Sequence, residues 1–143
     1  MAKPLSVSGA IVSWGLLGCA SWQPCPYGVT GQIVGVDSAV PAQRNRLVEE
    51  LESALHPLGF SAPEPVPHIE PEQILFSLTR GSSLTGDRLT VAIALDSMQL
   101  SIRDHVNVRE TPLAKDTITA VQTHLATAFH ATIDLKRVTR CYI

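Results

Sequence analysis

The fold is set by the stretch Arg88-Leu-Thr-Val-Ala-Ile-Ala-Leu-Asp-Ser-Met-Gln-Leu-Ser-Ile-Arg-Asp-His-Val106. Apolar and polar residues alternate along both halves of this stretch, which is the period of a strand with one buried face. A two-residue turn at Asp96-Ser97 would pair Leu95 with Met98 and bring both apolar sets to the same face. The stretch therefore predicts a β-hairpin.

Apolar residues recur at helical spacing on both sides of this hairpin. In Val40–Leu58, Pro41 suits the first turn of a helix and Gly59 suits the position just past its end. Thr111–Phe129 starts with a good N-cap residue, which is followed by Pro112. Both ranges are predicted to be amphipathic helices.

Further strands are predicted at Tyr27–Val36, Gln73–Arg80 and Thr132–Cys141. Gly31 and Gly35 in the first of them indicate a bulge or a close backbone approach. In the last strand, Lys136-Arg137 breaks the alternation, and a bulge is expected there. The segment 57–71 holds five prolines and is expected to be an extended surface loop.

The predicted order of elements is β-α-β-β-β-α-β. Two amphipathic helices can cover one face of a mainly antiparallel sheet. The sequence therefore predicts an α+β fold, a two-layer sandwich that is a variant of the ferredoxin-like arrangement. The length of 143 residues suits one domain, which is expected to span 27–143.

An apolar run from about Val7 to Leu17 follows the single charge of Lys3. Its length falls within the about 7–15 residues of a secretory leader and below the roughly 18 of a membrane-spanning helix. The run ends in Leu16-Leu17-Gly18-Cys19, which resembles the lipobox of bacterial lipoproteins. The resemblance implies that residues 1–18 are a cleaved signal peptide and that Cys19 carries the lipid. The alternative is a cytoplasmic protein whose first strand or helix is apolar.

Under this resemblance, residues 19–26 are a short tether between the lipid and the domain. The protein would be held in the bacterial cell envelope, facing the periplasm. Ala20 follows the lipid-bearing cysteine, where an aspartate would resemble an inner-membrane retention signal. The outer membrane is therefore favoured if the organism is Gram-negative.

The remaining cysteines, Cys25 and Cys141, lie near opposite ends of the predicted domain. The oxidising periplasm permits a disulfide between them, and we predict this bond. The alternative is two unpaired thiols, because sequence alone does not bring the two residues within bridging distance.

The densest polar cluster lies where the hairpin ends and the second helix begins. A sheet end of this kind gathers side chains, so the cluster is a candidate site for a partner. The alternative is local pairing of the two hairpin charges at the surface and a carboxylate near the positive end of the helix. The candidate residues are Arg103, Asp104, His105, Arg109 and Glu110.

Neither catalysis nor cofactor binding has positive support in the sequence. There is no Gly-x-Ser-x-Gly elbow, no phosphate loop and no redox Cys-x-x-Cys pair. The five histidines show no zinc spacing, so no metal or cofactor is expected. The net charge of −2 argues against a nucleic-acid partner and gives no reason to expect attraction to anionic lipid.

The sequence as a whole predicts a membrane-anchored envelope lipoprotein with a non-catalytic binding or assembly role and a protein partner. One alternative is an inhibitor or immunity-type lipoprotein that blocks a toxin or lytic enzyme. The other is a small periplasmic enzyme with a site that the sequence does not reveal.

Overall fold

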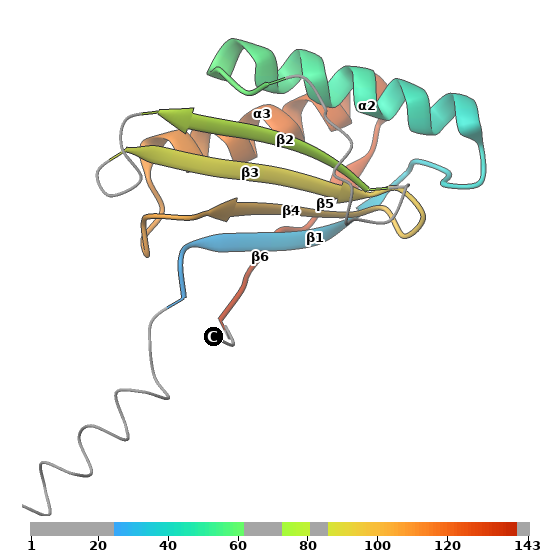
Figure 1. Ribbon diagram of the computed structural model, residues 1–143. Helices are drawn as coiled ribbons and strands as arrows, with labels where there is room; N and C mark the ends of the chain where they lie inside the picture. Colours follow the sequence, from blue (N-terminus) through green and yellow to red (C-terminus); the bar gives the residue numbers. More distant parts are fainter. Residues whose placement is uncertain (1–24, 62–72, 81–85, 140–143) are drawn as a thin grey trace, which may run out of the picture.

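The computed structural model describes residues 25–61, 73–80 and 86–139. The described chain forms two layers, an antiparallel sheet with two helices on one of its sides (Figure 1). The predicted α+β class and the order β-α-β-β-β-α-β are confirmed, with the last strand in two short pieces. The elements are β1 Gly28–Val34, α2 Pro41–Leu55, the 3-10 helix η1 His56–Leu58, β2 Gln73–Arg80, β3 Asp87–Ala94, β4 Gln99–Asp104, α3 Pro112–Phe129, β5 Thr132–Ile133 and β6 Lys136–Arg137.

The predicted hairpin is formed by β3 and β4. Val91 lies opposite Ile102, and Ile93 lies opposite Leu100. All four side chains are at most 1% exposed. The turn extends over 95–98, with Met98 in the left-handed region at φ 53°. The register that the alternation predicts is therefore correct, because only this register places both apolar sets against the helices.

The order of strands in the sheet is β2-β3-β4-β1-β5, and β6 also pairs with β1. All of these pairs are antiparallel. Since β4 and β5 both run antiparallel to β1, they are parallel to each other, and α3 connects them across β1. This split βαβ unit is the feature that the fold shares with the ferredoxin-like arrangement.

The helices begin and end where the sequence indicates. The hydroxyl of Thr111 accepts the backbone N–H of Ala114 at 3.1 Å and caps α3. Gly59 ends η1 at φ 98°, a conformation that glycine adopts without steric cost. Leucine side chains on the inner faces of both helices pack against the sheet in one core, including Leu47, Leu51, Leu55 and Leu125.

The predicted bulge at Lys136-Arg137 is wrong, since these two residues form β6. The interruption lies instead at Asp134 and Leu135, between β5 and β6. There the backbone passes directly over Gly31: a Cβ on Gly31 would lie 2.4 Å from the carbonyl oxygen of Asp134. The close approach expected at Gly31 is therefore confirmed, and it explains where the last strand is interrupted.

No helix in the described part of the chain is long and apolar enough to cross a membrane. The predicted leader, and most of the predicted proline loop, lie outside the described residues.

Candidate functional site

The two faces of the sheet differ in what covers them. Side chains alternate between the helix-covered face and the opposite one, which no helix of the described residues covers and which is here called the open face. Neighbouring strands place a set of short polar side chains on it, and several of its positions are exposed. The register assigns to the open face Thr30, Gln32, Thr79, Arg88, Thr90, Ala92, Ala94, Gln99, Ser101, Arg103, His105 and Lys136.

Four of these residues form a two-by-two array, here called the arginine-histidine array. It consists of Arg88 and Thr90 on β3, Arg103 on β4, and His105, which directly follows β4. Thr90 lies opposite Arg103 in the register. The backbone N–H of His105 donates to the carbonyl oxygen of Arg88 at 2.9 Å, which continues the same register by one pair. The Oγ1 of Thr90 lies 2.8 Å from Nε2 of His105, so a diagonal hydrogen bond joins the two rows.

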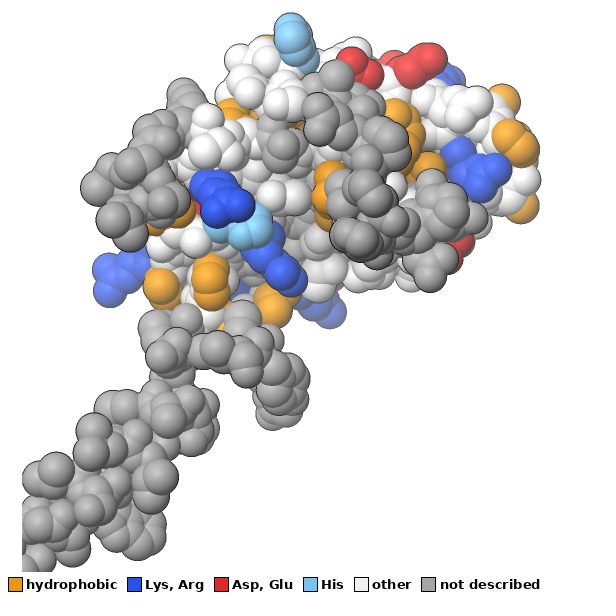
Figure 2. Space-filling view, viewed as in Figure 1, with side chains coloured by type: hydrophobic (Ala, Val, Ile, Leu, Met, Phe, Trp, Pro, Cys, Tyr) orange, Lys and Arg blue, Asp and Glu red, His pale blue; other side chains and the backbone are white. Residues whose placement is uncertain are grey.

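The array is positively charged. In Figure 2 a histidine lies between Lys or Arg side chains on this part of the surface. Partial burial, followed by the charges of Arg88 and Arg103, lowers the pKa of His105, and Asp104 opposes the shift. The environment of His105 therefore favours the neutral form of its imidazole. Within the described ranges, no carboxylate forms an ion pair with either arginine.

Asp104 belongs to the same strand but not to the same surface. It is 1% exposed. Its Oδ1 accepts the backbone N–H groups of Val106 and Asn107, each at 2.8 Å, and its Oδ2 accepts the Asn107 side-chain amide at 3.1 Å. These three hydrogen bonds of the carboxylate hold the loop that leads to α3. The carboxylate of Asp104 is thus a structural group.

Glu110 also has a partner within the chain. The hydroxyl of Tyr27 donates to its Oε2 at 2.7 Å. Burial, together with this hydrogen bond and the negative charge of Glu110, raises the pKa of Tyr27 to about 12, although Arg137 acts in the opposite direction. The guanidinium of Arg137 lies 5.0 Å from the centre of the Tyr27 ring and donates to the carbonyl oxygen of Val108 at 2.6 Å. The carboxylate of Glu110 therefore ties the loop before α3 to Tyr27, the residue directly before β1.

The sequence cluster is thus divided by the fold. Arg103 and His105 lie together on the open face, Asp104 is buried beneath them, and Glu110 is bonded to Tyr27. Arg109 is exposed on the loop before α3. The sequence reasoning missed Arg88 and Thr90, although the alternation of the hairpin contains the signal: in the predicted register these residues face His105 and Arg103.

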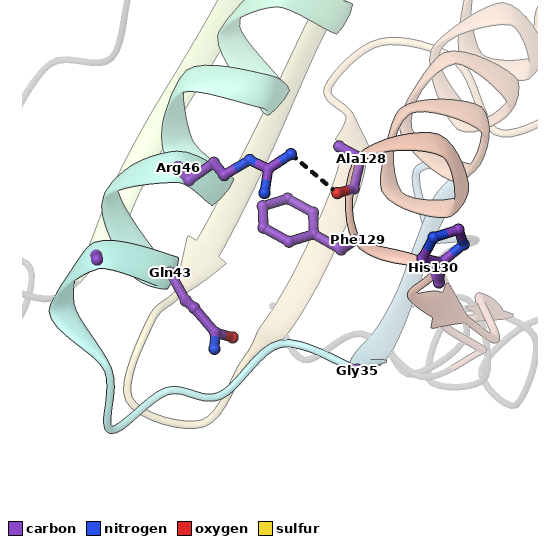
Figure 3. A pocket seen from close by; sticks show the side chains of 7 residues that line it. Gly35, Gln43, Arg46, Ala128, Phe129 and His130 are labelled. Carbon is purple, nitrogen blue, oxygen red and sulfur yellow. Dashed lines mark hydrogen bonds between the residues drawn. The ribbon is translucent and has the colours of Figure 1, made fainter.

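The helix side carries a shallow hollow of about 400 Å³ between the start of α2 and the end of α3 (Figure 3). Arg46 lies within it, donates to the carbonyl oxygen of Ala128 at 3.1 Å and lies 5.0 Å from the centre of the Phe129 ring. Both contacts tie α2 to the negative end of α3, where a cation is stabilising. Arg46 therefore acts in packing the two helices together.

Of the three cysteines predicted to carry the lipid or to form the disulfide, one is among the described residues. Cys25 is half-buried just before β1, and Cys19 and Cys141 lie outside the described residues. Lipid attachment and the Cys25–Cys141 bond therefore stay predictions. In the described ranges, no group of three histidine, cysteine or acidic side chains is placed to hold a metal ion.

Comparison of the chain with family models, with curated proteins and with solved structures finds no match.

Proposed function

We propose that this protein is a small lipid-anchored envelope lipoprotein with a non-catalytic binding or assembly role, and that a protein partner docks on its open face. The observation that carries the proposal is the asymmetry of the sheet. Two helices cover one face, while the other presents short polar side chains with exposed cations among them. Such a surface offers hydrogen bonds and charge without a reaction centre.

The charges of the open face indicate the kind of partner. Arg88, Arg103 and Lys136 are exposed there, and the carboxylate of Asp134 lies 3.9 Å from Lys136. The described part of this face is therefore positive, although the whole chain has a net charge of −2. Charge complementarity favours an acidic surface on the partner.

The proposed anchor limits where this partner can lie. Cys25 precedes β1 by three residues, and a tether of six residues from Cys19 reaches only about 20 Å when fully extended. The arginine-histidine array lies at the same end of the sheet as the start of β1, because Arg103 pairs with Gly28. The array would therefore be held near the membrane, which favours a partner that is itself bound to the envelope membrane.

A site-specific crosslinking experiment tests the docking face. A photo-reactive amino acid is placed in the full-length lipoprotein at Gln32 or Gln99, which are exposed on the open face, or at Gln122, which is exposed on α3. We expect both open-face positions to capture the same envelope protein in intact cells and the Gln122 position to capture none of it. Mass spectrometry of the crosslinked product identifies the protein.

The comparison is matched because all three positions are glutamines with exposed side chains. Equal capture of the same protein from Gln122 and from the open-face positions would contradict docking on the open face, and so would capture from Gln122 alone.

A further inference from the structure

We propose that the arginine-histidine array is a binding subsite for one oxyanion, a carboxylate of the docked partner, and that this subsite binds its anion more tightly as the pH falls. The inference deepens the proposed function and rests on it for the identity of the partner. The subsite itself is defined by Arg88, Arg103, His105 and Thr90.

Two guanidinium groups belong to the array. Arg88 and Arg103 come from neighbouring strands and from adjacent rows of the same face, and both are exposed. Cations at two such positions can both bind a single anion. Guanidinium groups also donate several hydrogen bonds in a fixed plane, which suits the oxygens of a carboxylate.

A neutral donor is available beside the two cations. The Oγ1 of Thr90 and the Nε2 of His105 lie 2.8 Å apart, and this hydrogen bond uses one of the two protons that the hydroxyl and the neutral imidazole carry. The other proton is left to donate to an anion. An anion on the array would therefore meet two cations and one neutral donor.

Protonation of His105 links the binding of the anion to pH. Partial burial and then the charges of Arg88 on β3 and Arg103 on β4 disfavour the charged form of the imidazole, and Asp104 on β4 favours it. On β2, the described residue that pairs with Arg88 is Thr79, which carries no charge. A bound anion offsets the field of the two arginines, so the pKa of His105 is higher in the complex than in the free protein. By linkage, the affinity for the anion rises as the pH falls through the range between these two values. The lower end of this range lies below 6.5, the ordinary pKa of histidine.

The subsite is tested with sulfate and acetate as probes. NMR follows the imidazole protons of the full-length protein, and the His105 signal is assigned by its absence in H105Q. Each anion is titrated at constant ionic strength against chloride. We expect both anions to raise the pKa of His105, and sulfate, whose charge is constant between pH 5 and 8, to bind more tightly at the lower pH.

The variants R88Q and R103Q are each expected to weaken sulfate binding by roughly three- to tenfold, which is the range for the loss of one exposed charged hydrogen bond. R109Q removes an exposed arginine outside the array and is expected to bind sulfate like the wild-type protein. The subsite is refuted if neither anion changes the titration of His105, or if R109Q weakens binding as much as R88Q and R103Q do.

The two proposals can fail separately. If the anions bind the array but crosslinking finds no docking on the open face, the subsite stands and the proposed function falls. If the crosslinked partner is captured equally well by R88Q and R103Q and the anions do not bind, docking on the open face stands and the subsite falls.

Discussion

Reduction of the oxidised protein is expected to lower its free energy of unfolding by about 4–5 kcal/mol, because a bond between Cys25 and Cys141 would close a loop of nearly the whole domain. The pairing of β1 with β6 supports this bond. Val29 lies opposite Arg137, and Thr30 lies opposite Lys136. In the sequence, Cys25 precedes β1 by three residues and Cys141 follows β6 by four.

The hydrogen bonds of β1 add a second reason. Both backbone groups of Tyr27 bond toward β4 and the loop after it, whereas the carbonyl oxygen of Gly28 accepts the N–H of Val138. The start of β1 and the end of the described chain are therefore hydrogen-bonded neighbours, and a bond between Cys25 and Cys141 requires the two ends of the domain to lie close together.

Urea unfolding of the wild-type protein with and without reductant measures the effect, and the variant C25S should match the reduced wild-type protein. Thiol counting in denaturant gives an independent result, because the bonded protein has no free thiol at these two positions. Two reactive thiols there, or an unfolding midpoint that reductant does not change, would show that the bond is absent.

The variant G31A is expected to lose about 2–3 kcal/mol of stability, the usual cost of forcing atoms into a packed region. The added Cβ would lie 2.4 Å from the carbonyl oxygen of Asp134 and 3.0 Å from its carbonyl carbon. Because both atoms belong to the backbone, no side-chain rotation relieves the overlap. The segment between β5 and β6 would have to move away from β1.

Gly28 supplies the matched control, because it lies in the same strand. A Cβ on Gly28 would meet its nearest atom, the carbonyl oxygen of Ile102, at 3.5 Å, which is an ordinary contact. G28A should therefore change the free energy of unfolding by about 0.5 kcal/mol or less. Denaturant unfolding of both variants measures the difference, and equal losses for G31A and G28A would contradict the close approach as the reason for glycine at position 31.

The sequence predicted those parts of the fold that depend on local patterns. The alternation of 88–106 predicts the register of β3 with β4, and Thr111 and Gly59 correctly mark helix ends. The interruption of the last strand was misplaced because its cause is not local. It depends on a backbone contact between Gly31 and Asp134, which are about a hundred positions apart in the chain.

The candidate site was only partly predictable for a related reason. Arg103 and His105 were recognised in a dense polar cluster, but the cluster mixes side chains from both faces of a strand. Asp104 lies between them in sequence and points into the protein, where it caps a loop. Arg88, which completes the array, is 15 or more positions away and becomes a neighbour only through strand pairing.

The proposed role of this protein in the cell envelope depends on where the chain is held. The most direct test is the intact mass of the protein isolated from the membrane fraction of the cells that make it. The lipoprotein account predicts a chain that has lost residues 1–18 and gained the mass of acyl chains on Cys19. An unmodified chain that begins at Met1 and is recovered from the cytosol would contradict it.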